Sequence, residues 1–172
     1  MCDPDRRTPL HLAVGLQMGD RIIFTELMLH EADTNLVDKQ GNTPLHTLIK
    51  VIRKLDDAEA MALEVVAADR TNVNIVDGHD RSPLLLSVTY ISLPLVNALL
   101  GRQADPNIRD KDQDLPLHAS LRMAGIRVTS CLYLVVSMCG VGTVGEGGWG
   151  EKGERGAGEE RKWIIISQWY YY

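Results

Sequence analysis

The 172-residue sequence lacks several features that would point to particular classes of protein. Its three cysteines, Cys2, Cys131 and Cys139, form neither a paired disulfide framework nor a Cys-x-x-Cys metal motif. The first residues contain no apolar run of the kind found in a signal peptide. These absences argue against a disulfide-rich secreted protein, and a cytoplasmic or nuclear location is expected.

The sequence also lacks a basic excess. Residues 1–134 contain 14 lysines and arginines against 18 aspartates and glutamates, and residues 135–172 contain 4 against 5. Duplex binding requires clustered positive charge, so no nucleic-acid partner is expected. An uncharged stretch of 18 residues, 128–145, could suggest a membrane span, but it is interrupted by glycines, and half of it belongs to the repeat pattern described below. A membrane partner is therefore not expected either.

What the sequence does contain is a pattern that occurs four times. Each copy has an Asp five residues before a position that is followed by Pro-Leu. The four Asp residues are Asp3, Asp38, Asp77 and Asp110, and the four prolines are Pro9, Pro44, Pro83 and Pro116. The prolines are separated by 35, 39 and 33 residues. A fixed period in this range indicates an array of structural repeats.

Each copy predicts a tight turn followed by a helix. Thr or Ser directly before Pro places a hydroxyl at the helix N-cap and Pro at the first helical position. The residues before that hydroxyl, for example 38–42 and 77–81, favour a projecting turn. An Asn stands eight residues before the capping position in the last three copies, as Asn35, Asn74 and Asn107. All variation in length therefore falls between the two helices of a unit.

These motifs resemble the Thr-Pro-Leu-His opening of ankyrin repeats. Residues 8–11 and 43–46 match it in full, whereas Leu85 replaces the His of the third copy and Leu115 replaces the Thr of the fourth. The resemblance covers residues 3–134. It implies an all-α solenoid of four helix-turn-helix units with projecting turns, at about residues 3–37, 38–76, 77–109 and 110–134.

Finer expectations concern individual helices. Ile22, Ile23, Leu27 and Leu29 are expected to form an apolar stripe on the second helix of the first unit. In the second unit the first helix is expected to reach about Leu55, and residues 56–59 to form a capped start for a second helix through Ala68. The fourth unit should continue to about Leu134. Residues 135–172, which are Gly-rich and end in an apolar aromatic segment, are expected to be a disordered tail.

Sequence motifs for chemistry are absent or explained by structure. Residues 140–145 have the spacing of a dinucleotide-binding loop, but no helix pattern follows them. His11, His46 and His118 recur at one position of the unit in three of the four units, too far apart to share a zinc ion. The resemblance implies hydrogen bonds near the turn of each histidine's own unit. No Ser/His/Asp or Cys/His set can be nominated. We therefore expect no metal, no cofactor and no catalytic activity.

The resemblance implies binding of a partner protein on the concave face and the turn tips. The family's variable positions correspond to Lys39, Gln40, Asn42, His79, Arg81, Tyr90, Lys111, Asp112, Asp114 and Arg122. Tyr90 and Arg122 are the best candidate anchors, because Tyr and Arg are enriched in binding hot spots. An alternative is that the chain is a fragment of a larger protein, either the cytosolic array of a membrane channel or the substrate-recruiting arm of an enzyme. An intrinsic enzyme is the third possibility.

Overall fold

The computed structural model describes residues 3–15, 21–55 and 57–123, with side chains as far as residue 120. The described residues form helices α1 (Pro9–Gly15), α2 (Arg21–Leu29), α3 (Pro44–Val51), α4 (Ala58–Ala67), α5 (Pro83–Thr89), α6 (Leu93–Gly101) and α7 (Pro116–Met123). Helices α1 and α2, α3 and α4, and α5 and α6 form contacting pairs, and α7 opens a fourth unit beside α5. The predicted all-α array of helix-turn-helix units is confirmed.

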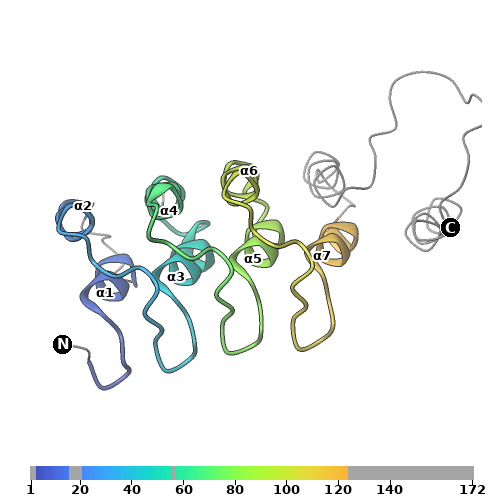
Figure 1. Ribbon diagram of the computed structural model, residues 1–172, viewed down its shortest axis with the longest axis horizontal. Helices are drawn as coiled ribbons and strands as arrows, with labels where there is room; N and C mark the ends of the chain where they lie inside the picture. Colours follow the sequence, from blue (N-terminus) through green and yellow to red (C-terminus); the bar gives the residue numbers. More distant parts are fainter. Residues whose placement is uncertain (1–2, 16–20, 56, 124–172) are drawn as a thin grey trace, which may run out of the picture.

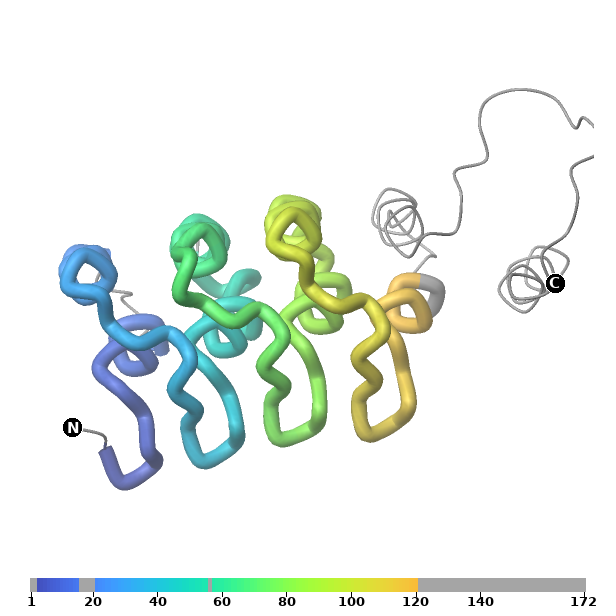
Figure 2. The backbone as a smooth tube through the Cα atoms, in the orientation of Figure 1, coloured from blue at the N-terminus to red at the C-terminus, as the bar shows by residue number. Residues whose placement is uncertain are grey.

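The helices lie in two rows (Figure 1). Helices α1, α3, α5 and α7 form one row, called here the inner helices, and α2, α4 and α6 form the other, the outer helices. Four loops project from the inner row, away from the outer helices (Figure 2). These loops, called fingers, are residues 3–7, 38–42, 77–81 and 110–114.

The inner helices begin as the Thr/Ser-Pro pattern predicts. Thr43 and Ser82 have extended backbone, and their side-chain oxygens accept hydrogen bonds from the third helical N–H. Such a cap satisfies a backbone donor that has no partner inside the helix. In the fourth unit Leu115 has no oxygen to offer, as expected, but its own N–H still donates to Nδ1 of His118 at 3.2 Å. In α3 the capping residue and the histidine three positions later each accept a bond from the other's backbone N–H. In the fourth unit only the bond to the histidine remains.

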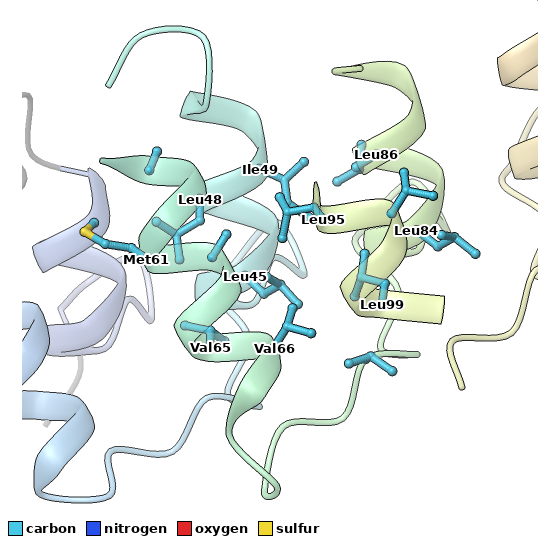
Figure 3. Packing of buried hydrophobic residues seen from close by; sticks show 14 of the residues in the cluster. Leu45, Leu48, Ile49, Met61, Val65, Val66, Leu84, Leu86, Leu95 and Leu99 are labelled. Carbon is cyan, nitrogen blue, oxygen red and sulfur yellow. The ribbon is translucent and has the colours of Figure 1, made fainter. Parts of the chain in front are cut away.

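The core is a continuous apolar layer between the two rows (Figure 3). Its fully buried members from the second and third units include Leu45, Leu48, Ile49, Met61, Val65, Leu84, Leu86, Leu95 and Leu99. Within the described residues every buried side-chain nitrogen and oxygen has a hydrogen-bond partner. The units are thus joined by apolar contacts through the helices and by satisfied polar groups around them.

The structure corrects finer expectations about three helices. In α2 Leu27 packs against the core as expected of an apolar stripe, but the fully buried residue is Phe24, and Ile22, Ile23 and Leu29 are 75%, 48% and 70% exposed. Helix α3 ends at Val51 rather than near Leu55, since a bond from Lys54 N to Val51 O tightens the next turn.

The start of α4 also differs from the expectation. Asp57 occupies its N-cap position, but its backbone is helical and its side chain makes no cap bond. Helix α4 itself, Ala58–Ala67, agrees with the predicted second helix to within one residue. The expected second helix of the fourth unit, the domain boundary near Leu134 and the tail lie outside the described residues.

Candidate partner-binding surface

Each finger is built on its first residue, an Asp. In all four fingers Oδ1 of that Asp accepts hydrogen bonds from the backbone N–H groups two and four residues later, at 2.8–3.1 Å. The fourth residue of each finger has a positive φ of 60–75°, and these residues are Arg6, Gly41, Asp80 and Gln113. The same local chemistry thus gives the fingers one conformation, as the Asp- and Gly-rich pattern predicts.

Neighbouring fingers are joined through their backbones. Lys39 N donates to Asp5 O at 2.9 Å, Gly78 N to Gln40 O at 2.8 Å, and Lys111 N to His79 O at 3.2 Å. The fingers approach closely, because a Cβ built on Gly41 would lie 2.6 Å from Gly78 N. The four fingers therefore form one continuous row with a fixed backbone.

The recurring histidines fasten each unit to the next. Nδ1 of His46 lies 2.8 Å from Thr43 Oγ1, and its Nε2 lies 3.1 Å from the carbonyl oxygen of Arg81 in the next finger. His11 makes the equivalent bonds to Thr8 and to Asn42 O. The expected bond within the histidine's own unit is present, but the second bond crosses to the following unit. Burial lowers the pKa of His46 to about 4, so its imidazole is neutral at pH 7.

Asp77 is the most heavily bonded carboxylate of the finger row. Its Oδ2 accepts from Arg81 Nη2 at 2.7 Å, from Arg81 Nε at 3.1 Å and from Lys50 Nζ at 3.0 Å, and its side chain is 1% exposed. Burial by itself would raise the pKa of Asp77. The hydrogen bonds from Arg81, His79 N and Lys50 outweigh it and hold the pKa well below the usual range. Asp77 is therefore a charged anchor that joins the third finger to α3.

A hollow of about 290 Å³ lies between the first two fingers and helices α1 and α3. Finger residues and inner-helix residues line it together: Arg7, His11, Leu12, Gly15, Asp38, Gln40, Asn42, Thr47, Lys50 and Val51. Two of its lining residues are bonded to each other, because Lys50 Nζ donates to Asn42 Oδ1 as well as to Asp77 Oδ2. The hollow thus joins the two kinds of surface that the sequence nominated, the finger tips and the first helices.

The predicted partner-binding residues fall into two groups. Those at the finger tips are exposed: Lys39, Gln40, His79, Lys111 and Asp112. The others are partly buried: Asn42, Arg81, Tyr90 and Asp114. The side chain of Arg122, in α7, lies outside the described side chains.

The partly buried group includes residues that the fold itself uses. Arg81 is held by Asp77, and Tyr90 is the C-cap residue of α5, with its side chain packed against the core. Both side chains therefore contribute to the fold. Their role in binding stays a prediction.

Two residues of the hollow were missed by the sequence reasoning although their register could have identified them. Arg7 stands directly before Thr8, as Asn42 and Arg81 stand before Thr43 and Ser82. Lys50 stands seven residues after its capping Thr43, the same place that Arg122 has after Leu115. The sequence predicts partner-binding residues at both of these repeat positions in other units, namely Asn42, Arg81 and Arg122.

Neither a metal cluster nor a membrane span is found in the described part of the chain. No group of three or more His, Cys, Asp or Glu side chains there could hold a metal ion. No helix among residues 3–15, 21–55 and 57–123 is long and apolar enough to cross a bilayer. The uncharged stretch at 128–145 and the glycine motif at 140–145 lie outside the described residues.

Paired helices stacked in two rows, with a finger before each pair, define a helical-repeat solenoid. A family model described as ankyrin repeat matches residues 5–39. The chain belongs to the ankyrin-repeat family, as its motifs predict.

Three curated proteins illustrate the similarity. The chain is 26% identical to phosphocholine transferase AnkX of Legionella pneumophila, over 72% of this chain and 13% of that protein. It is 26% identical to the nuclear factor NF-kappa-B p105 subunit of Gallus gallus, over 74% of this chain and 13% of that protein. It is 30% identical to Rabankyrin-5 of Homo sapiens, over 66% of this chain and 10% of that protein. The chain thus spans 13% or less of the length of these relatives.

Proposed function

We propose that this ankyrin array binds a segment of a partner protein across its fingers and inner helices. The observation that carries the proposal is the hollow between the first two fingers, α1 and α3. Ankyrin repeats are generally protein-protein interaction modules, which supports the same reading. The hollow offers polar side chains, Lys50 among them, beside the partly exposed apolar side chain of Leu12.

The fixed backbone of the finger row favours binding. Each finger is held by its own Asp and by a backbone bond to the neighbouring finger, so binding orders few backbone torsions. A preorganised surface loses less conformational entropy when a partner binds. The exposed side chains at the tips can then differ from finger to finger without changing the scaffold.

We also propose that the array has no catalytic activity of its own. The hydroxyl-imidazole pairs Thr8–His11 and Thr43–His46, with 2.8 Å between oxygen and nitrogen, have the spacing of a nucleophile and a base. Both threonines are buried, their hydroxyls cap helices, and each histidine's second nitrogen bonds a backbone carbonyl. A substrate would have to displace structural bonds to reach them, which supports a binding role.

The proposal is tested by filling the hollow. Thr47, in the wall formed by α3, is replaced by Trp, and the affinity for a captured partner is measured by titration. A matched control, Asn97→Trp, places the same side chain on an exposed position of α6, in the outer row. Blocking a hot-spot region typically costs several kcal/mol, so we expect at least about a hundredfold weaker binding for Thr47→Trp. Unchanged affinity for Thr47→Trp, or an equal loss for both variants, would place the partner elsewhere.

A second variant tests the finger tips, including Gln40, which also lines the hollow. The double variant Lys39→Ala, Gln40→Ala removes exposed tip side chains while leaving the Asp38 turn and the backbone ladder intact. We expect roughly tenfold weaker binding with an unchanged melting temperature, because exposed substitutions usually alter stability by no more than about 0.5 kcal/mol. Arg81 and Tyr90 are poorer test positions, since truncating them would combine a folding defect with a binding defect.

A second candidate is that the array serves as the recruiting arm of a longer protein. The observation that favours it is the small share, 13% or less, of each relative that the chain covers, one of these relatives being named a transferase. Under this proposal the array supplies binding and another domain supplies the activity. Identical partner affinity of the chain alone and of the full-length gene product is expected, and an affinity present only in the longer protein would contradict it.

A further inference from the structure

Charge is divided unevenly between the two sides of the array. The sides compared are the fingers with the inner helices, residues 3–15, 38–55, 77–92 and 110–123, and the outer helices with the segments that follow them, residues 21–37, 57–76 and 93–109. The first side has nine lysines and arginines against eight aspartates and glutamates, and the second has four against eight. The buried carboxylates of the described residues, Asp38, Asp77 and Asp110, all belong to the first side. The finger side therefore exposes more cations than carboxylates, although the whole chain has a net charge of −5 at pH 7.

One cluster on the finger side holds two cations on a single buried carboxylate. Lys50 Nζ and Arg81 Nη2 donate to the same oxygen, Oδ2 of Asp77, at 3.0 and 2.7 Å. The side chain of Asp77 is 1% exposed, whereas those of Lys50 and Arg81 are 27% and 31% exposed. The lowered pKa of Asp77 keeps this carboxylate ionised at pH 7. The cluster therefore has one positive charge in excess, and almost all of its exposed surface belongs to the cations.

The two cations keep hydrogen-bond donors for a further acceptor. A lysine ammonium has three N–H groups and an arginine guanidinium has five. Lys50 uses two of its three, on Asp77 and on Asn42 Oδ1, and Arg81 uses one at Nε and one at Nη2. Their other donors bond no acceptor within the described residues. Asp77 Oδ1 is itself occupied by the N–H groups of His79 and Arg81, so the carboxylate stays in place when a further anion approaches.

The cluster borders the hollow between the first two fingers. Lys50 lines that hollow together with the partly exposed apolar side chains of Leu12 and Val51. The arrangement is found at one junction of the described array. The residues at the places of Lys50, Asp77 and Arg81 are Gly15, Asp38 and Asn42 between the first two units, and Thr89, Asp110 and Asp114 between the last two. Neither of these sets contains a cation, so the excess charge is specific to the junction beside the hollow.

We propose that the Lys50–Asp77–Arg81 cluster binds a carboxylate of the partner, so that the segment which enters the hollow is acidic. This inference rests on the proposed function and specifies the chemistry of the partner. An aspartate or glutamate of the segment accepts hydrogen bonds from Lys50 and Arg81. Because Lys50 also lines the hollow, an apolar side chain within a few residues of that carboxylate packs against Leu12 and Val51.

The charge of the cluster favours a carboxylate over a phosphate. Hydrogen bonds between charged groups are roughly twice as strong as those between neutral groups, so the remaining donors favour an anionic acceptor. One carboxylate neutralises the single excess charge. A phosphorylated side chain, with a charge of about −2, would leave negative charge uncompensated beside the buried Asp77.

The test selects the segment from random sequences. A displayed library of short random peptides is selected on the full chain, and the selected peptides are titrated against the chain and against Thr47→Trp, which fills the hollow. We expect the peptides that lose affinity for Thr47→Trp to share an Asp or Glu close to an apolar residue. Hollow-dependent peptides without a shared acidic position would overturn this inference and leave the proposed function intact. If no peptide depends on Thr47, the proposed function itself fails.

A double-mutant cycle on one selected peptide tests the contact. Replacing the acidic residue of the peptide by its amide, and Lys50→Met in the chain, should each weaken binding by about tenfold or more. The two changes together should weaken it by clearly less than the product of the separate losses. Lys50→Met leaves both bonds from Arg81 to Asp77 in place, and the peptide change needs no variant of the chain. An amide peptide that binds as well as the acidic one, or fully multiplicative losses, would contradict the contact.

Two controls separate the cluster from general attraction between charges. Lys54 is an exposed cation four residues after Lys50 and outside the lining of the hollow. Lys54→Met should leave the affinity nearly unchanged, because salt screens exposed charges. A loss equal to that of Lys50→Met would mean that net charge rather than the cluster attracts the peptide. A phosphoserine in place of the acidic residue should bind no more tightly, and tighter binding of this phosphopeptide would overturn the assignment of a carboxylate.

Discussion

The finger row and the row of outer helices follow different rules. The fingers have one length and one hydrogen-bonding scheme in all four units, each on a single Asp. The outer helices differ more: α4 has ten residues, whereas α2 and α6 have nine. They also differ in how they begin and in which residues they bury. The fingers are specified by polar bonds with directional geometry, whereas the outer helices need only apolar contacts of suitable volume.

Like the fingers, the segments that begin at Asn35, Asn74 and Asn107 have a fixed length up to the next inner helix. Asn35 Nδ2 donates to Arg70 O and its Oδ1 accepts from Asn72 N, while Asn74 Oδ1 accepts from Asp105 N. The segments between Asn35 or Asn74 and the next inner helix are thus attached to the neighbouring unit at both ends. An insertion there would break bonds at one end, so insertions occur between the helices.

The largest effect is expected where an outer helix meets the core. Leu99→Ala should lower the free energy of unfolding by roughly 2 to 5 kcal/mol, since Leu99 is fully buried and its truncation leaves a cavity. Leu29→Ala, at a 70% exposed position of α2, should change it by less than about 0.5 kcal/mol. Urea denaturation measures both. Equal losses would mean that the outer helices do not pack as described.

Asp77→Ala should have the largest effect in the finger row. It removes the partner of Lys50 and Arg81 and leaves the N–H groups of His79 and Arg81 without their acceptor. We expect a loss of about 3 to 4 kcal/mol by the same denaturation, because breaking a buried charged cluster leaves its other members uncompensated. Asp112→Ala, at an exposed finger tip, is the control and should be nearly neutral. A mild effect of Asp77→Ala would show that the apolar stacking alone fixes the fingers.

The link between α3 and the third finger should depend on pH through His46. Its pKa is lowered to about 4 in the folded state, from an ordinary value of 6.5, so the unfolded chain takes up the proton first as pH falls. The contribution of the neutral His46 to the free energy of unfolding is therefore complete above pH 6.5. It is lost as the pH falls from 6.5 to 4, which lowers the free energy of unfolding by about 3 kcal/mol. Asp77, whose pKa is lowered from 3.8, adds a further loss only below that value.

Denaturation midpoints measured between pH 7 and 4 test this link. His46→Gln should flatten the curve over that range. His30→Gln, at an imidazole whose side chain is 84% exposed, should leave the curve unchanged. A slope that persists in His46→Gln would assign the pH dependence to other groups.

The smallest effect concerns the turn geometry. Gln113 is exposed and has a φ of 64°, so Gln113→Gly should stabilise the fourth finger by up to about 1 kcal/mol by removing the strain of a side chain in the left-handed region. Gly41→Ala should have the opposite sign, because a Cβ there would meet the backbone of Gly78. Thermal melts of the two variants decide the matter. Shifts of the same sign would mean that the two fingers are not equivalent.

Local sequence patterns determined the repeat register, the inner-helix starts and the fingers. The bonds that form them join residues two to four positions apart, such as Asp38 with Asn42 or Thr43 with His46, so residue types at fixed spacing are sufficient to predict them. Arg7 has the same place before its capping residue as Asn42 and Arg81 have before theirs, so the sequence pattern alone could have identified it as well. Family membership also followed from these motifs alone.

Tertiary structure decided which side of α2 is buried, because Phe24, Ile22 and Ile23 are adjacent and equally apolar, and only the position of the neighbouring units distinguishes them. It also decided that Lys50 pairs with Asp77, 27 residues away, and that His46 reaches the next finger. Such contacts depend on how the units stack rather than on any local spacing. For the same reason only the structure shows that Lys50 and Arg81 share one buried carboxylate beside the hollow.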